Sequence, residues 1–233
     1  MQISLLHTID SNPAVFEQAA RDAGLTAGAL RHDVRPALRI AVDQAQATAS
    51  AIPDSLKDEI EAALQTLAAG ADAVIVTCAT LGPVVDGIKG IRVPVIRADE
   101  ALAEIAARAG TRIVVLCAAE SAVAANRVMF ERHARPAGAT VDVRLVPQTW
   151  DLFKRGETAA CLAAVAQAAR AAWEGGADVV AFAHPWMAGA ASALPAEFRP
   201  LDGASASLAM AARVTPRVAS RVASRVVSQR AAP

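Results

Sequence analysis

The sequence predicts an α/β protein made of two pseudo-symmetric halves, each with a mostly parallel sheet. The first observation is a repeat: Gly70-Ala-Asp and Gly176-Ala-Asp each open an apolar run that ends, at the same distance, at Cys78 and His184. The second is the alternation of short apolar runs with longer helical patterns, which is typical of parallel sheets covered by helices. The third is the length, because 233 residues suffice for one large or two small domains.

The strands that open the two halves extend the repeat. Ile3–His7 and Ile113–Cys117 are apolar runs of the kind that forms buried parallel strands, and a serine follows each at the same offset, Ser11 and Ser121. Alanine-rich α/β chains also produce such likenesses by chance, which is the competing interpretation. A parallel sheet binds ligands at the carboxyl ends of its strands, so the repeat places Cys78 at an equivalent point to His184.

Helical patterns fill the spaces between the strands. Residues 16–24 and 130–138 share Phe, Glu, Ala, Arg, Ala and Gly in register, and each predicts a helix closed by a C-terminal glycine. The longest other helices are expected at 54–69, 99–109 and 157–174, with Asp54 and Asp99 as N-caps.

The remaining expectations concern strands and boundaries. Residues 25–50 are polar and fit no clear element, so we expect a lid or an irregular connection there. We expect a first domain at 1–97 plus 203–233, a second at 98–202, and an active site in the cleft between them. Strands are expected near 2–7, 73–78, 93–97, 112–117, 141–146, 179–184 and 199–201.

Composition limits the classes of function. The formal net charge is zero, which removes a general electrostatic case for nucleic acid or an anionic membrane and favours a small-molecule ligand. No run approaches about 20 apolar residues and the N-terminus carries no signal-peptide pattern, which predicts a soluble cytoplasmic protein. Cys78, Cys117 and Cys161 lack metal-type spacing, so neither a disulfide framework nor a metal site is expected.

Thr77-Cys78-Ala-Thr80-Leu-Gly-Pro after the first Gly-Ala-Asp, the second Gly-Ala-Asp strand and the opening Leu-Leu-His-Thr resemble the aspartate/glutamate/hydantoin racemase superfamily. The resemblance covers the chain to about residue 212. It implies two pseudo-symmetric Rossmann-like domains and an isomerase without cofactor, in which one residue from each half, usually cysteine, works on opposite faces of a carbon acid. Arylmalonate decarboxylase and maleate isomerase-like enzymes share this plan.

On this plan Cys78 moves a proton on one face of the substrate carbon and His184 on the other. A helix N-terminus beyond the strand would favour the Cys78 thiolate, and the free N–H groups there, with the Thr80 hydroxyl, could hold a carboxylate. His184 titrates near neutral pH, which suits an acid. Family members usually carry Cys-Thr in the second half, so a histidine that only holds a loop is the alternative for His184-Pro185.

Further residues are expected to bind substrate. Ala118 and Ala122 stand where family members often have threonine, which argues against plain aspartate or glutamate and for a monocarboxylate or cyclic amide with an apolar substituent. Trp186 and Met187 would form an apolar wall, and the cluster at 31–35 could supply a cation from a loop. The expected substrate-binding residues are His7, Thr8, Ser11, Asn12, Thr80, Ser121 and Trp186.

Two other functions stay open on the residues alone. The first is a one-cysteine decarboxylase or other lyase in which Cys78 protonates an enolate. The second is a small-molecule binding protein that has lost one catalytic residue. A homo-oligomer is also open, and the arginine-rich segment from Arg213 onward is expected as a terminal helix or as a contact for an acidic surface.

Overall fold

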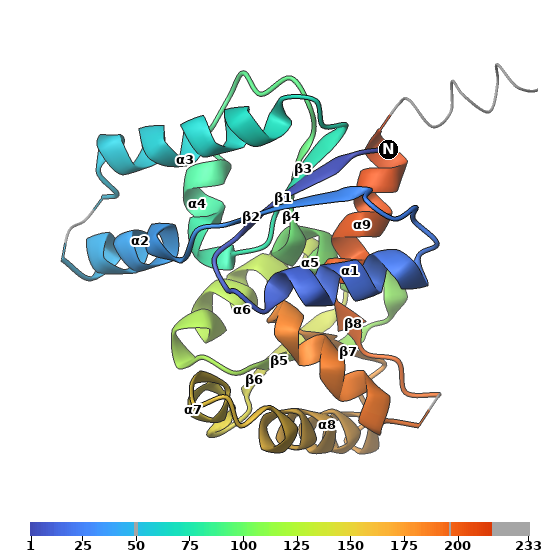
Figure 1. Ribbon diagram of the computed structural model, residues 1–233. Coiled ribbons are helices and arrows are strands. Elements are labelled where there is room, and N and C mark those ends of the chain that lie inside the picture. Colours follow the sequence, from blue (N-terminus) through green and yellow to red (C-terminus); the bar gives the residue numbers. More distant parts are fainter. Residues whose placement is uncertain (49–50, 196, 216–233) are drawn as a thin grey trace, which may run out of the picture.

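The computed structural model of the protein describes residues 1–48, 51–195 and 197–215. These residues form two four-stranded parallel sheets, one in the upper and one in the lower part of Figure 1. The strand orders are β2-β1-β3-β4 and β6-β5-β7-β8, so the second strand of each half lies at an edge and the third and fourth follow the first. The predicted α/β fold with two pseudo-symmetric halves is confirmed.

The strands correspond pairwise along the chain. Ile3 lies opposite Ala73 in the first sheet, and Ile113 lies opposite Val179 in the second. Because the first and third strands of each half are central and covered on both faces, their sequences are continuous apolar runs. The strands are β1 (Ile3–His7), β2 (Leu30–Val34), β3 (Ala73–Val76), β4 (Val95–Arg97), β5 (Arg112–Cys117), β6 (Thr140–Leu145), β7 (Val179–Phe182) and β8 (Leu201–Asp202).

Helices cover both faces of each sheet. Asp54 and Asp99 do not cap α3 and α5, because Pro53 and Arg97 occupy the N-cap positions; the two carboxylates instead bind Lys57 and Arg97. The helices are α1 (Asn12–Asp22), α2 (Pro36–Thr48), α3 (Asp54–Ala68), α4 (Gly82–Val85), α5 (Ala98–Ala109), α6 (Glu120–Ala134), α7 (Thr149–Lys154), α8 (Thr158–Glu174) and α9 (Gly203–Val214), with 3₁₀ turns η1 (Ala79–Leu81), η2 (Arg135–Ala137) and η3 (Pro185–Ala193).

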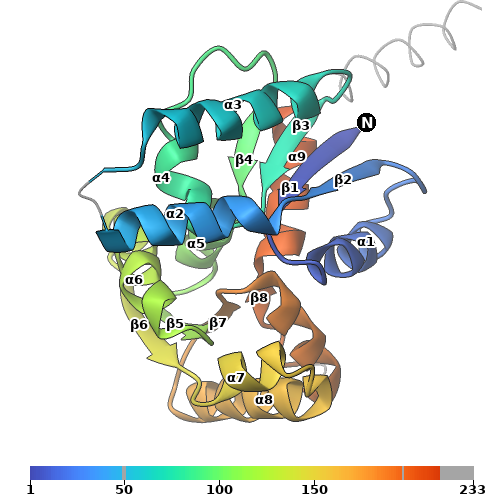
Figure 2. The same ribbon diagram turned by 60° about the vertical axis from the view of Figure 1, so that its left-hand side comes forward.

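Three hydrophobic cores hold these layers together. One lies between the first sheet and helices α2 and α3, and a second between the other sheet and α8, η3 and α7. Figure 2 shows α3 at the upper end of the molecule, with α2 below it, and α7 and α8 at the lower end. The third core is shared by both sheets, and Phe16 and Phe130, the matching phenylalanines of the repeat, are both fully buried in it.

The repeated Gly-Ala-Asp has a structural explanation. The carboxylate of Asp72 accepts a hydrogen bond from the backbone N–H of Gln2, and the Asp178 carboxylate accepts one from that of Arg112. Each aspartate thus ties the entry of the third strand to the entry of the first strand in its own half. The preceding glycines, Gly70 and Gly176, have φ of 75° and 90°, a conformation that side chains disfavour.

Residues 25–50 were interpreted wrongly. Within them the structure has the edge strand β2 and the helix α2, not a lid or an irregular connection. β2 was hard to recognise because its sequence, Leu-Arg-His-Asp-Val, is mostly charged, as an edge strand can be. β8 begins at Leu201, two residues later than expected.

The domain boundaries remain a prediction. α9 returns from the second sheet to pack on α5, which lies in the expected second domain, and on α1 in the first, so these contacts do not assign it to one half. Residues 216–233, which hold most of the arginine repeat, lie outside the described residues, and Arg213 lies 3.9 Å from Glu104. In the part of the chain that the structure describes, no helix is both long and apolar enough to cross a membrane.

Candidate active site

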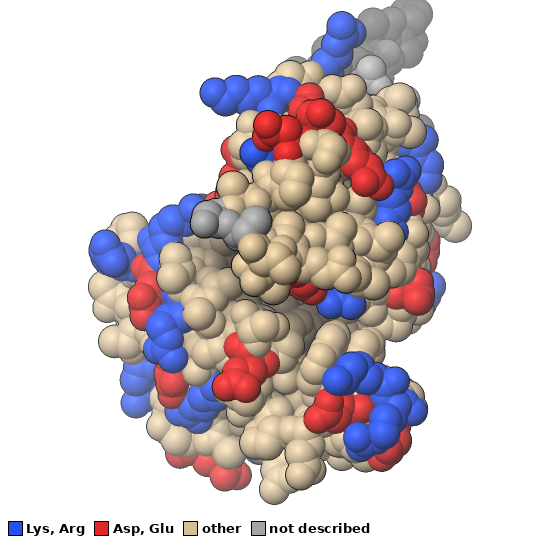
Figure 3. Space-filling model, turned by 90° about the vertical axis from the view of Figure 1, so that its left-hand side faces the viewer, with Lys and Arg blue, Asp and Glu red and all other residues tan. Residues whose placement is uncertain are grey.

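A cavity of about 310 Å³ is lined by both halves at the carboxyl ends of the central strands. Figure 3 shows the molecule hollowed between its upper and lower parts, with mostly uncharged atoms in the hollow. The cavity brings Cys78 and His184 to one space. Its lining is Thr8, Ile9, Asn12, Arg39, Asp43, Thr77, Cys78, Ala79 and Thr80 from the first half, and Ala119, Ser121, Ala122, Trp150, Ala183, His184 and Pro185 from the second.

Cys78 stands two residues beyond β3, where the chain turns into η1. Burial raises the pKa of the Cys78 thiol, while hydrogen bonds from the Thr8 side chain, the Leu81 and Thr80 backbone and the Thr80 side chain lower it in part. The expected preference for thiolate is therefore wrong. The helix beyond the strand, α4, has four residues and contributes little dipole, so desolvation dominates and the thiol keeps its proton.

His184 occupies the equivalent position, two residues beyond β7. Burial lowers the pKa of His184 to about 4, so the ring is neutral near pH 7 and does not titrate there as expected. Its Nε2 accepts a hydrogen bond from the backbone N–H of Ala119 at 3.4 Å. That contact assigns the ring proton to Nδ1, and the Nε2 lone pair accepts this hydrogen bond from a residue of the cavity wall.

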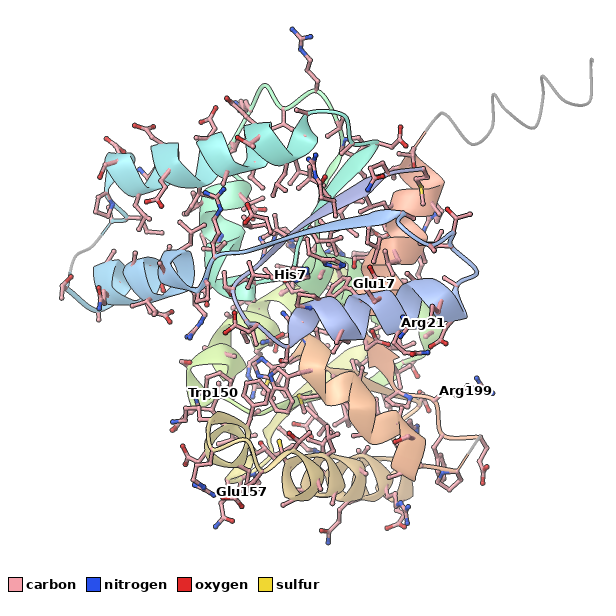
Figure 4. The ribbon with its side chains drawn as sticks, viewed as in Figure 1. His7, Glu17, Arg21, Trp150, Glu157 and Arg199 are labelled. Carbon is pink, nitrogen blue, oxygen red and sulfur yellow. The ribbon has the colours of Figure 1, made fainter. Side chains whose placement is uncertain are left out.

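Aromatic side chains gather around His184. Its ring stacks with Trp186 at a centroid distance of 5.7 Å and with Trp150 at 6.3 Å, and Phe153 stacks on Trp186 at 4.3 Å. Trp150, from α7, reaches the cavity, as Figure 4 shows below the sheet of the first half. Trp186 and Met187 are buried behind His184 instead, so the expected apolar wall comes from Trp150.

The other predicted site residues divide into two groups. Thr8, Asn12, Thr80 and Ser121 line the cavity. His7, Ser11 and Trp186 do not: the first and last are buried in the protein behind the cavity wall, and Ser11 is exposed at the start of α1. Successive residues at a strand end point to opposite faces of the sheet. Thr8 and His7 therefore face different sides although they are adjacent in the sequence.

Arg39 is the cation that the sequence did not reveal. It reaches the cavity from α2, its Nη1 lies 3.2 Å from Asp43 Oδ2, and its buried Nε has no hydrogen-bond partner among the described residues. The cluster at 31–35 supplies no such group. Arg31 donates to the Leu67 carbonyl at the end of α3, and Arg35 pairs with Asp33.

The other two cysteines lie away from the cavity. Cys117 is fully buried in the shared core, and burial raises the pKa of its thiol to about 12. Cys161 is buried on α8, where its thiol donates to the Thr149 carbonyl. Neither thiol is placed to meet a substrate in the cavity.

Comparison with known proteins gives one family. The sequence profile described as Asp/Glu/Hydantoin racemase matches residues 10–211. A search of curated proteins found no match.

Similar solved structures share the fold at low sequence identity. An aspartate racemase from Picrophilus torridus is 14% identical with a TM-score of 0.68, covering 91% of this chain and 92% of that one. An aspartate racemase homologue from Pyrococcus horikoshii is 13% identical, with a TM-score of 0.64 and coverage of 92% and 98%. An allantoin racemase from Klebsiella pneumoniae is 18% identical, with a TM-score of 0.62 and coverage of 91% and 86%.

Proposed function

The chain belongs to the Asp/Glu/Hydantoin racemase family, and from this premise we propose that it inverts a carbon centre next to a carboxylate or amide by using His184 as base and Cys78 as acid. The membership confirms the expectation of a racemase-type enzyme from the sequence, and it does not favour the lyase or the binding-protein alternative. The residues, the substrate and the absence of a cofactor are our proposal. The observation that carries it is the single cavity lined by both side chains.

The two groups have complementary resting states for this chemistry. His184 is neutral with a lone pair on Nε2, and Cys78 is a protonated thiol. Nε2 takes the proton from one face of the substrate carbon, in place of its long bond from Ala119, and the C–H electron pair passes into an enolate. The Cys78 S–H then gives its proton to the opposite face, which leaves imidazolium and thiolate. The reverse reaction, from the opposite enantiomer, uses that imidazolium–thiolate pair, and transfer of a proton from the imidazolium to the thiolate through solvent restores the resting pair after product release.

The cavity wall suits a substrate with one anionic or carbonyl end. The hydroxyls of Thr8 and Thr80 are donors for a carboxylate or an enolate oxygen, and so is the Arg39 guanidinium, whose Nε has no partner within the described part of the chain. Trp150 offers an apolar face on the other side. We therefore propose a monocarboxylate or cyclic amide with an apolar substituent, rather than plain aspartate or glutamate.

The proposal includes no cofactor and no metal, because the two side chains already supply the base and the acid. It also places the protein in a reducing cytoplasm, in keeping with three buried, unpaired cysteines.

The test is racemisation of single enantiomers. A panel of amino acids, 5-substituted hydantoins, allantoin and 2-substituted acids is followed by circular dichroism, with wild type, Cys78→Ala and the matched buried-cysteine control Cys161→Ala. We expect wild type and Cys161→Ala to racemise at least one panel member and Cys78→Ala to lose at least about a thousandfold in rate. Racemisation that survives in Cys78→Ala would refute the assignment.

A Cys78→Ser variant refines this test. Its hydroxyl has the same position but a much higher pKa, so it holds the proton too firmly to serve as an efficient acid. We expect it to bind substrate as wild type does while turning over slowly. A loss of binding equal to the loss of rate would mean that Cys78 recognises substrate and transfers no proton.

A further inference from the structure

A chain of hydrogen bonds runs from the surface to the cavity wall through residues that the proposed chemistry does not use. Glu17 Oε1 lies 3.1 Å from His32 Nε2, and His32 Nδ1 lies 2.8 Å from His7 Nε2. His7 Nδ1 lies 3.0 Å from the Oγ1 atom of Thr77, the residue before Cys78. Figure 4 shows His7 and Glu17 close together between β2 and α1.

At the inner end of this hydrogen-bond chain, the contacts of Thr77 determine which atoms donate and which accept. The one hydroxyl hydrogen of Thr77 is directed to the Leu6 carbonyl at 3.2 Å. Thr77 Oγ1 is therefore an acceptor toward its other two neighbours, His7 Nδ1 and the Asn12 side-chain nitrogen at 3.4 Å. His7 must carry its proton on Nδ1. Burial and the neighbouring His32 lower the pKa of His7 to about 3, so this ring is neutral and its Nε2 is an acceptor.

The outer end then requires one extra proton. His32 Nδ1 must donate to His7, while His32 Nε2 faces the Glu17 carboxylate, which only accepts. Both nitrogens of His32 carry hydrogen, and the pair is imidazolium and carboxylate. The titratable groups that face His32 are His7 from β1 and Glu17 from α1. Arg31 and Asp33, its neighbours on β2, point to the opposite face because side chains alternate along a strand.

The consequence at the cavity is the orientation of Asn12. Because Thr77 can only accept from it, Asn12 turns its nitrogen to Thr77 and leaves its carbonyl oxygen for the cavity. That oxygen is buried and has no partner among the described residues. A buried acceptor without a donor costs free energy until a ligand supplies one.

We propose that His7, held by His32 and Glu17, is a positioning residue that fixes Asn12 as an acceptor for an N–H or O–H group of the substrate. This deepens the proposed function and rests on it for the substrate alone. The hydrogen-bond chain itself is a property of the free protein. Without His7 the Thr77 hydroxyl is free to turn toward Asn12, and the amide can then present its nitrogen to the cavity instead.

The chain is tested first without substrate. ¹⁵N NMR of the ring nitrogens distinguishes the tautomers, and the sequence has only four histidines, so assignment by single His variants is direct. At pH 6 we expect His7 as the Nδ1–H tautomer beside a doubly protonated His32. A His7 ring in the Nε2–H tautomer at pH 6 would overturn the proposal.

Glu17→Gln sharpens this experiment, because the amide no longer demands a proton on His32. The tautomers of both histidines should then change together. Asp22→Asn is the matched control. It removes the same charge from the same helix, where the Asp22 carboxylate accepts a side-chain hydrogen bond only from Gln18 among the described residues, and it should leave both rings as in wild type. A change of tautomer at one histidine without a change at the other in Glu17→Gln would contradict a coupled hydrogen-bond chain.

The second test is kinetic. His7→Leu removes the donor to Thr77, whereas His7→Asn places an amide nitrogen near the former Nδ1. We expect KM to rise about tenfold to a hundredfold in His7→Leu with a smaller change in kcat, and KM within about threefold of wild type in His7→Asn. Equal damage in both variants, or a loss confined to kcat, would overturn a positioning role.

Discussion

The two halves share a backbone plan to the level of strand order and register, yet they offer the cavity different walls. The first half contributes hydroxyls, an amide and a guanidinium, from Thr8, Thr80, Asn12 and Arg39. The second contributes the methyl groups of its alanines and the face of Trp150, with one hydroxyl at Ser121. The duplicated backbone sets the positions of the side chains around the cavity. On the proposed function, the chemistry of those side chains determines which end of a substrate each half binds.

The same difference applies to the two proposed proton-transfer groups, Cys78 and His184. Burial raises the pKa of Cys78 and lowers that of His184, and in both cases it favours the neutral form. A pair of cysteines in this environment would both rest as thiols, and one would have to lose a proton before it could act as base. On the proposed mechanism, the neutral histidine in the second half acts as base without that step.

The largest effect should come from removing either group, and the two losses should differ in kind. Cys78→Ala and His184→Asn should each reduce racemisation at least about a thousandfold. Cys78→Ala retains the base, so it should still exchange the α-proton of one enantiomer with solvent deuterium, without inversion. His184→Asn retains only a thiol with a raised pKa and should exchange neither enantiomer near pH 7. Mass spectrometry and chiral chromatography in heavy water measure both quantities.

The opposite pattern would reverse the assignment. If His184→Asn keeps one-sided exchange and Cys78→Ala loses it, the cysteine is the resting base. Exchange of both enantiomers in either variant would mean that a third group in the cavity takes protons. Cys161→Ala serves as the control for the removal of a buried thiol outside the cavity.

The next largest effect is the dependence of stability on pH, to which one histidine from each half contributes. His184 and His7 have folded pKa values of about 4 and about 3, below the usual 6.5, so the unfolded chain binds protons first as the pH falls. Their contribution to stability is complete above pH 6.5 and is lost as the pH falls toward 4. For His184 this amounts to about 3 kcal/mol over that interval, and urea unfolding at a series of pH values measures it.

Single variants separate the two contributions. His184→Asn should have a shallower fall in stability between pH 6.5 and 4, with the share of His7 left in place. An identical slope in wild type and His184→Asn would show that His184 is not neutral in the folded protein at pH 6.

The comparison of halves also explains what the sequence could predict. Asp72 and Asp178 make equivalent hydrogen bonds in the two halves, and Phe16 and Phe130 are both buried in the shared core. The repeat in the sequence therefore predicted the fold. It also brought Cys78 and His184 to equivalent points. The sequence did not predict β2 because an edge strand needs no apolar run. Its counterpart β6 was predicted from a more regular alternation of apolar and polar residues.

The site was less predictable because it depends on side-chain direction and on contacts across the sequence. Arg39 comes from a helix in the stretch that had no assigned element, and Trp150 comes from the short helix α7. His7 and Thr8 are neighbours in sequence, but only Thr8 lines the cavity. The pKa of Cys78 follows from burial that no local pattern records.

A third prediction tests the turn that carries Cys78. A Cβ atom on Gly82 would lie 2.2 Å from Arg97 Nη2, and that guanidinium is 8% exposed and bonded to both Asp86 and Asp99. Gly82→Ala should therefore break a buried ion pair and cost about 2 to 3 kcal/mol in unfolding free energy, with lower activity. In the second half Gly189→Ala meets only the flexible Leu162 side chain, at 3.0 Å, and should cost less than about 1 kcal/mol by the same urea titration. Equal costs would mean that Arg97 adjusts freely.

The smallest effect distinguishes the two serines that follow the opening strands. Ser11 is exposed, and its side chain makes no capping hydrogen bond to α1, so Ser11→Ala should change stability by less than about 0.5 kcal/mol and leave activity intact. Ser121 lies in the first turn of α6 and lines the cavity, so Ser121→Ala should raise KM about twofold to tenfold through the loss of one hydrogen bond to substrate, with kcat nearly unchanged. Steady-state kinetics on the two variants measures the contrast directly. Equal behaviour would place the substrate against the first half alone, with the second half supplying only His184 and the face of Trp150.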